Sequence, residues 1–173
     1  MKNFGGPALF LDRSDINTDE IIPARYLTEI TKMALQPYIL EDLKIGGFDP
    51  GSEAVRQANV IVTRANFGCG SSREHAVWVF EVNDINVVVA ESFARIFRQN
   101  MFNCGMLAIE LPRKDIDALF GLGEGTAVAV DVAGERLTAK NGDQEVSLGF
   151  TLNGFDKELV LAGGWLAYAD RKY

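Results

Sequence analysis

The sequence predicts an α/β fold in one domain over residues 1–173, with a mainly parallel sheet flanked by helices and with β-hairpins near the C-terminal end. Three observations predict this fold. Apolar, β-branched runs alternate with helical stretches between residues 60 and 111, which is typical of βαβ units on a parallel sheet. Alternation of apolar and polar residues follows residue 125. Finally, 47% of the chain is hydrophobic, which is enough to bury a core.

The central part of the chain supplies three strands and two helices. Strands are expected at 60–65, 85–90 and 106–111, where Val, Ile and other apolar residues dominate. Helices are expected at 73–82 and 92–103, because neither stretch contains Gly or Pro. A further short helix is expected at 112–120, since Pro112 suits a first helical turn and Gly121 suits a helix end.

The N-terminal part is less regular. Residues 8–11 predict a short first strand, and residues 12–19 predict a polar loop rich in turn-forming Asp, Asn and Ser. The following region through residue 43 is expected to be helical in part and interrupted at Pro37.

The C-terminal part predicts hairpins and a closing helix. Strands are expected at 126–132, 135–140 and 145–150, and Asn141-Gly142 between the last two is a strong hairpin signal. Residues 156–169 predict a closing helix, which Gly163-Gly164 weakens because each glycine costs about 1 kcal/mol relative to alanine.

Composition excludes several classes of function. A formal net charge of -7 and a pI near 4.8 argue against nucleic-acid binding, which needs a basic surface. No apolar run has membrane-spanning length, so no membrane association is expected. Cys69 and Cys104 form no metal-ligand spacing, and the first residues lack the apolar core of a signal peptide, so we expect no metal on this chain and a cytoplasmic location.

The most informative segment is Asn-Phe-Gly-Cys-Gly-Ser-Ser-Arg-Glu-His at 66–75, which contains the only histidine. It is expected to form a strand-to-helix turn. Gly68 and Gly70 allow positive φ or close approach of a ligand, and Ser71 and Ser72 are expected where a helix N-terminus leaves N–H groups unpaired. Such a turn favours an anion.

Several chemistries compete for this segment. A serine hydrolase would pair a serine with His75, although the Gly-x-Ser-x-Gly elbow is absent. The segment lacks the lysine that a P-loop requires, and it lacks the third glycine of a dinucleotide-binding fingerprint. Cys69 is a possible nucleophile, and Ser71 is alternatively a simple helix cap with Arg73 in a surface ion pair.

The remaining chemistry is carboxylate recognition with proton transfer. Arg73 would bind a carboxylate through its bidentate fork, N–H groups of the turn would stabilise negative charge, and a serine would move the proton. Serine alone is a poor base. Its alkoxide requires N–H dipoles, Arg73 and a dry pocket that another part of the assembly closes.

Three segments in order, 15–24, 66–76 and 90–97, resemble the swivelling β/β/α domain of the aconitase superfamily, and within it the separate small subunits of the 3-isopropylmalate dehydratase family. The resemblance implies a hydro-lyase subunit that is active only with a large subunit. That large subunit carries a [4Fe-4S] cluster, and this chain binds no cofactor. The reaction removes water from a small hydroxy-dicarboxylate and adds it back at the neighbouring carbon.

The resemblance also implies roles for individual residues. Ser71 corresponds to the serine that takes the proton, Ser72 and Arg73 to groups that hold a substrate carboxylate, and Thr18 and Asp19 to a pair lining the pocket. Gly70 belongs to the same substrate-binding turn. Arg95, in the third segment, is expected to be structural.

The segment after the Thr-Asp pair is expected to set substrate specificity through Arg25, Tyr26, Leu27, Thr28 and Glu29. Thr28 and Glu29 offer no partner for a third carboxylate, while Arg25 offers one only if it faces the pocket. An alkyl-substituted malate such as 3-isopropylmalate, in leucine biosynthesis, is therefore the preferred substrate. Alternatives are 2,3-dimethylmalate, citramalate and homoaconitate-type substrates. An alternative of another class is a stand-alone carboxylate-binding or regulatory module.

Overall fold

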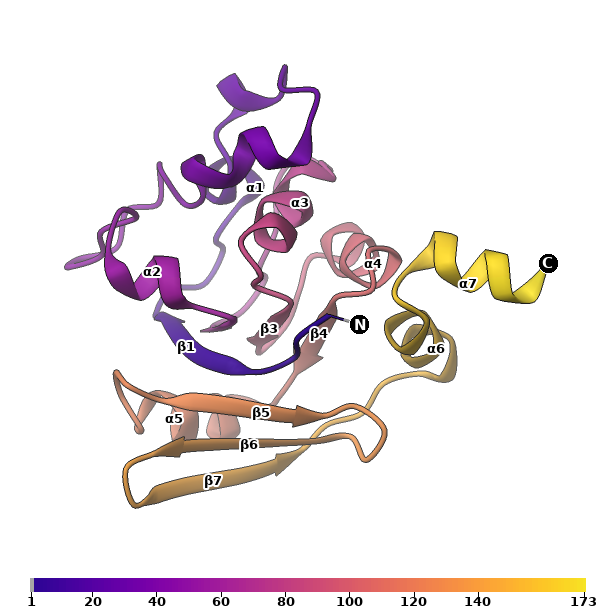
Figure 1. Ribbon diagram of the computed structural model, residues 1–173. Helices are drawn as coiled ribbons and strands as arrows, with labels where there is room; N and C mark the ends of the chain where they lie inside the picture. Colours follow the sequence, from indigo (N-terminus) through magenta and orange to yellow (C-terminus); the bar gives the residue numbers. More distant parts are fainter. Residues whose placement is uncertain (1) are drawn as a thin grey trace.

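The computed structural model describes residues 2–173, which form a curled seven-stranded sheet with strand order β4-β3-β2-β1-β5-β6-β7 (Figure 1). Four strands are parallel: β1 (Gly6–Leu11), β2 (Val60–Thr63), β3 (Val87–Ala90) and β4 (Leu107–Glu110). Three strands are antiparallel: β5 (Ala127–Asp131), β6 (Arg136–Asn141) and β7 (Gln144–Gly149). The predicted α/β class with C-terminal hairpins is confirmed, with the parallel pairs confined to one half of the sheet.

The parallel half contains the centre of the core. Every residue of β2 and β3 is buried, so these strands are covered on both faces and read as unbroken apolar runs. Helix α3 (His75–Val82) connects β2 to β3, and α4 (Arg95–Asn103) connects β3 to β4. The two helices contact each other, and α4 also packs against β4.

The antiparallel half extends the sheet beyond β1. Strand β5 pairs with β1 only through Gly6 and Pro7, whereas β5, β6 and β7 pair along their length. Gly142, with φ +60°, supplies the tight turn between β6 and β7 that the Asn-Gly pair predicts. Helix α5 (Arg113–Phe120), which was also expected, contacts β2 and β7.

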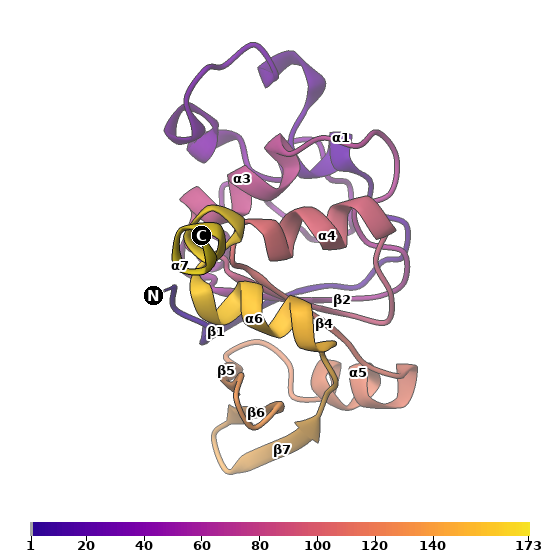
Figure 2. The ribbon, with the colours of Figure 1, turned by 90° about the vertical axis from the view of Figure 1, so that its right-hand side faces the viewer.

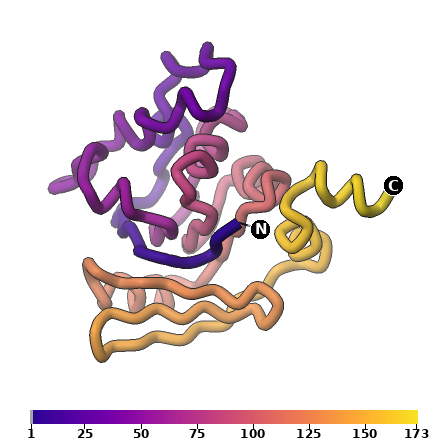
Figure 3. The backbone as a smooth tube through the Cα atoms, viewed as in Figure 1, coloured from indigo at the N-terminus to yellow at the C-terminus, as the bar shows by residue number. Residues whose placement is uncertain are grey.

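The segment between β1 and β2 crosses over the upper part of the molecule and is traced in indigo and purple in Figure 3. It contains α1 (Thr18–Ile21), the 3-10 helices η1 (Ala24–Tyr26) and η2 (Lys32–Tyr38), and α2 (Glu53–Gln57). The expected polar loop at 12–19 therefore ends in a helical turn. The region through residue 43 is helical in short 3-10 turns, with Pro37 inside η2.

The expected closing helix is two helices, α6 (Gly154–Ala162) and α7 (Trp165–Lys172). The chain turns at Gly163 and Gly164, which have φ values of +94° and +117°. A Cβ at Gly164 would lie 2.7 Å from the carbonyl oxygen of Asn103, so the junction packs tightly on the C-terminal end of α4. Figure 2 shows α7 beside that end of α4. No helix within residues 2–173 combines the length and apolar character needed to cross a bilayer.

Candidate functional site

Three segments that are distant in the sequence meet at the carboxyl ends of β1, β2 and β3. The N–H of Gly68 donates to the carbonyl of Ile16 at 2.8 Å, and the N–H of Thr18 donates to the carbonyl of Cys69 at 2.9 Å. On the other side, the N–H of Ala94 donates to the carbonyl of Phe67 at 2.9 Å. Backbone hydrogen bonds therefore fix the Gly-rich turn between the segment that begins α1 and the segment that begins α4.

Gly68 allows α4 to approach the turn. It has φ +82°, and a Cβ at this position would lie 2.2 Å from Cγ of Phe97. The ring of Phe97 thus occupies the space that any other side chain would fill. Phe97 also contacts the ring of Phe67 edge-on, with centroids 5.4 Å apart. The glycine requirement here comes from close packing as well as from backbone conformation.

A capping box fixes the start of α1. The Asn17 side chain accepts the Glu20 N–H at 3.0 Å, and the Glu20 carboxylate accepts the Asn17 N–H at 3.1 Å. Glu20 is also paired with the guanidinium of Arg13. Thr18, the first helical residue, is only 2% exposed, and its Oγ1 donates to the carbonyl of Ser71 at 2.9 Å. The capping box therefore orients the residue that holds the serine loop.

Ser71 and Ser72 precede the helix and do not cap it, which corrects the expected position. Helix α3 begins at His75, two residues later than predicted, and its N-cap is Glu74. Both serines are exposed, and within residues 2–173 neither their hydroxyls nor their backbone N–H groups donate to a protein acceptor. The serine loop stays outside the helix for two reasons. Gly70 has φ +90°, and the hydroxyl of Thr18 donates a hydrogen bond to the Ser71 carbonyl. The simple helix-cap interpretation of Ser71 is therefore wrong.

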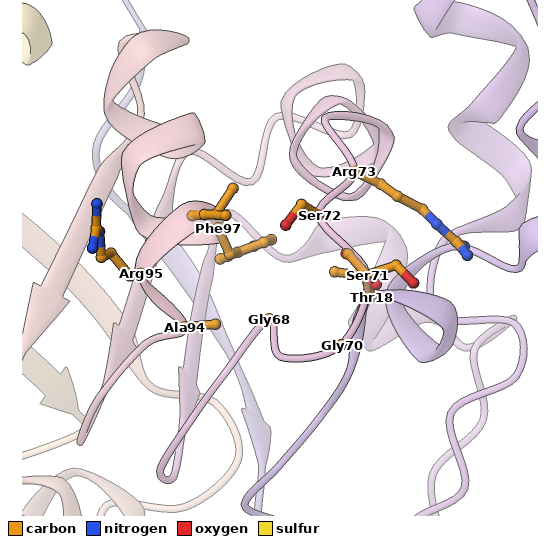
Figure 4. Close-up of a pocket in the computed structure, with 10 residues that line it drawn as sticks. Thr18, Gly68, Gly70, Ser71, Ser72, Arg73, Ala94, Arg95 and Phe97 are labelled. Carbon is orange, nitrogen blue, oxygen red and sulfur yellow. Dashed lines mark hydrogen bonds between the residues drawn. The ribbon is translucent and has the colours of Figure 1, made fainter.

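Arg73 extends away from the serines and is ion-paired with Asp19. The Arg73 side chain is 20% exposed and that of Asp19 is 58% exposed. Figure 4 shows Arg73 directed to the opposite side of the loop from Phe97. Two of the predicted site residues thus contact each other directly across the boundary between α1 and the Gly-rich turn.

The three segments enclose an open pocket of about 380 Å³ (Figure 4). Its lining consists of Thr18, Gly68, Gly70, Ser71, Ser72, Arg73, Ala94, Arg95, Ile96 and Phe97. Two arginines and no acidic residue line it, although the chain as a whole carries a net charge of -7. The pocket therefore has the charge and the hydroxyl groups that suit a small anion.

The predicted specificity segment does not line this pocket. Arg25 is bound to Asp42 through two hydrogen bonds of 3.1 and 3.2 Å and lies 3.3 Å from Glu41. Tyr26 is stacked on Tyr38 with ring centroids 3.8 Å apart. Leu27 is half-buried, whereas Thr28 and Glu29 are exposed.

The competing nucleophiles lack the partners they need. The His75 ring lies 4.8 Å from the Trp78 ring, and no hydrogen bond joins it to either serine among the described residues. Burial, with a smaller contribution from the charge of Asp15, raises the pKa of the Cys69 thiol. A raised pKa keeps the thiol protonated near neutral pH, so Cys69 is poorly suited to nucleophilic attack.

Metal ligation has no evident place in the part of the chain that the structure describes. No three His, Cys, Asp or Glu side chains within residues 2–173 are grouped to hold a metal ion.

Sequence reasoning missed the contribution of the first turn of α4. Ala94, Arg95 and Ile96 line the pocket, and Arg95, expected to be structural, is exposed and has no ion-pair partner among the described residues. One signal was available: an arginine at the first position of a helix lies at the positive end of the helix dipole, where it does not stabilise the helix.

The fold and the site together define an α/β domain with an open, anion-directed pocket at the carboxyl ends of its parallel strands. The chain belongs to the aconitase C-terminal domain family, which matches residues 5–114.

Curated relatives extend over nearly the whole chain. The 3-isopropylmalate dehydratase small subunit of Aromatoleum aromaticum is 34% identical over 186 residues, covering 93% of this chain and 85% of the relative. That of Halalkalibacterium halodurans is 32% identical over 174 residues, covering 95% and 88%. A crystal structure of 3-isopropylmalate dehydratase from Methanocaldococcus jannaschii superposes with a TM-score of 0.80 at 29% identity, covering 97% of this chain and 93% of the other.

Proposed function

We propose that this chain is the small subunit of a 3-isopropylmalate dehydratase or of a closely related hydro-lyase, and that it completes an active site on a large subunit. The observation that carries the proposal is the pocket at the Gly-rich turn, with its exposed hydroxyls and Arg73, in a chain similar over nearly all its length to small subunits of that enzyme. The pocket is open to solvent, which supports a site that a second chain closes.

Ser71 is the proposed proton-transfer base. In dehydration, the C–H proton next to a substrate carboxylate passes to Ser71 Oγ, and the hydroxyl group leaves from the neighbouring carbon. In rehydration, Ser71 returns a proton to the carbon that lost the hydroxyl group, and the hydroxyl group of a water adds to the carbon that lost the proton. A serine alkoxide needs nearby positive charge and donors. The exposed Ser71 hydroxyl, the uncommitted N–H groups of the loop and the adjacent Arg73 support this role. Exclusion of water by a partner would strengthen each interaction.

Arg73, Ser72 and Gly70 are proposed to bind one substrate carboxylate. A guanidinium binds a carboxylate through two parallel hydrogen bonds, and Arg73 lines the same pocket as both serines. Asp19 pairs with Arg73 and Thr18 holds the Ser71 carbonyl, so both are proposed to orient this group. In the proposed complex the [4Fe-4S] cluster of the large subunit supplies Lewis-acid chemistry for loss of the hydroxyl group.

An alkyl-substituted malate is the proposed substrate class. A tricarboxylate needs a further cationic partner, because burying an unpaired carboxylate costs several kcal/mol. Arg25 is already bound to Asp42 and lies outside the pocket lining, which supports a substrate with two carboxylates. Ala94 and Phe97 give the same pocket an apolar side that suits an alkyl group.

Co-expression with a cluster-bearing large subunit, followed by anaerobic purification, tests the proposal. Hydration of a panel of unsaturated di- and tricarboxylic acids is followed by loss of alkene absorbance. We expect a complex that consumes an alkylmaleate. Consumption of tricarboxylates alone would overturn the substrate assignment. Tight dicarboxylate binding by the isolated chain, with no complex, would instead favour the stand-alone binding module.

A further inference from the structure

Arg95 and Ile96, the first two residues of α4, form a small surface at the edge of the pocket that the proposed reaction does not use. Both residues line the pocket, and both are exposed; Ile96 is 52% exposed. Figure 4 shows the Arg95 side chain directed away from Ser71 and Ser72, on the side of the pocket opposite Arg73. The guanidinium therefore faces outward from the pocket and away from the reacting groups.

Nothing within the described chain accounts for an arginine at this position. Arg95 makes no hydrogen bond or ion pair with its side chain among residues 2–173, whereas nearby Arg98 lies 3.6 Å from both Glu110 and Asp156. At the first position of a helix, its charge is opposed by the helix dipole. An unpaired guanidinium beside an exposed isoleucine is instead the combination that protein interfaces favour, since arginine is enriched there and apolar side chains supply desolvated contact.

We infer that Arg95 and Ile96 anchor this chain to its large subunit. The inference rests on the proposed function, in which a second chain closes the pocket. Because these side chains stand at the edge of the opening, a chain that closes it must cover them. The matching surface on the large subunit is an apolar patch that carries a carboxylate, which pairs with the Arg95 guanidinium while Ile96 packs beside it.

Charge reversal at Arg95 tests the inference, with Arg171 as the matched control. Arg171 is also an exposed helical arginine without an ion-pair partner among residues 2–173, but it lies in α7, which packs near the opposite end of α4. The large subunit is titrated with wild-type chain, Arg95→Glu, Arg95→Gln, Ile96→Ala or Arg171→Glu. The association constant is measured at two salt concentrations, and KM is measured at saturating large subunit.

We expect Arg95→Glu to weaken association at least about tenfold, Arg95→Gln and Ile96→Ala less, and Arg171→Glu by less than about twofold. The wild-type association should also lose more affinity in high salt than that of Arg95→Gln. KM should stay within about twofold of wild type once the subunits are saturated. Unchanged association, or a loss seen only in KM, overturns the inference. Failure of the wild-type chain to bind or to support turnover would instead contradict the proposed function.

Discussion

The guanidinium of Arg73 is paired with the carboxylate of Asp19, a residue 54 positions earlier in the chain. The pair connects the loop that carries the serines to the first turn of α1. Asp19 is largely exposed and Arg73 is partly exposed, so the pair contributes at most about 1 kcal/mol to folding. Its more important consequence is positional, because it fixes the direction of the guanidinium beside the pocket.

Replacement of Arg73 by lysine tests whether the planar fork matters. Lysine keeps the charge and can still pair with Asp19, but it cannot form two parallel hydrogen bonds with a carboxylate. We expect kcat/KM of the assembled enzyme to fall about 10- to 100-fold, which corresponds to about 1.4–2.7 kcal/mol. Steady-state kinetics measures the change. Wild-type values of both KM and kcat would exclude Arg73 from substrate binding.

Gly68 should be the most sensitive position for the architecture of the pocket. Gly68→Ala places a Cβ 2.2 Å from the Phe97 ring at φ +82°, so strain and overpacking together should cost roughly 2–5 kcal/mol. Gly123→Ala is the control, because Gly123 has φ +75° but nothing within 4 Å of its Cβ position. It should cost only about 1 kcal/mol. Urea unfolding compares the two variants.

A second comparison separates packing from backbone strain. In a Phe97→Ala background the ring is absent, so adding Gly68→Ala should cost less than it does in the wild-type chain. Equal costs in both backgrounds would show that contact with Phe97 does not determine the glycine requirement.

The capping box predicts a stability loss in acid. Burial raises the pKa of Glu20, but the hydrogen bonds from Arg13 and the Asn17 backbone outweigh it, so the pKa is lowered overall. The ionised carboxylate therefore stabilises the fold above its unfolded pKa, near 4.3, and this contribution is lost as the pH falls through the lower folded value.

Glu20→Gln should therefore flatten the decline of unfolding free energy between about pH 5 and pH 3. Glu124→Gln, which changes an exposed acid without an ion pair among the described residues, is the control. Denaturant unfolding across this pH range measures both. An identical acid decline in Glu20→Gln and wild type would remove Glu20 as a source of the pH dependence.

Much of the sheet could be predicted from the sequence because its signals are local. Buried β-branched runs predict β2 and β3, and Asn141-Gly142 predicts the turn between β6 and β7. The start of α3 was predicted two residues early, because the bond from Thr18 to the Ser71 carbonyl is a contact over 53 residues that no local pattern reveals.

The pocket, too, could be predicted only where its signals are local in the sequence. Glycines, serines and Arg73 in one short segment identified its centre, whereas its second side depends on how α4 packs against Gly68. Arg95 and Ile96 reach the pocket only through that packing. Likewise, the pairing of Arg25 with Asp42 depends on tertiary structure, so the sequence left its orientation open.

The central claim is that Ser71 moves the proton in a site shared with a large subunit. The most direct test compares alkylmaleate hydration by wild-type and Ser71→Ala complexes at equal complex concentration and cluster content. The account predicts that Ser71→Ala forms the complex and binds substrate with near wild-type affinity but loses turnover by at least about a thousandfold. Near wild-type turnover in Ser71→Ala would contradict it.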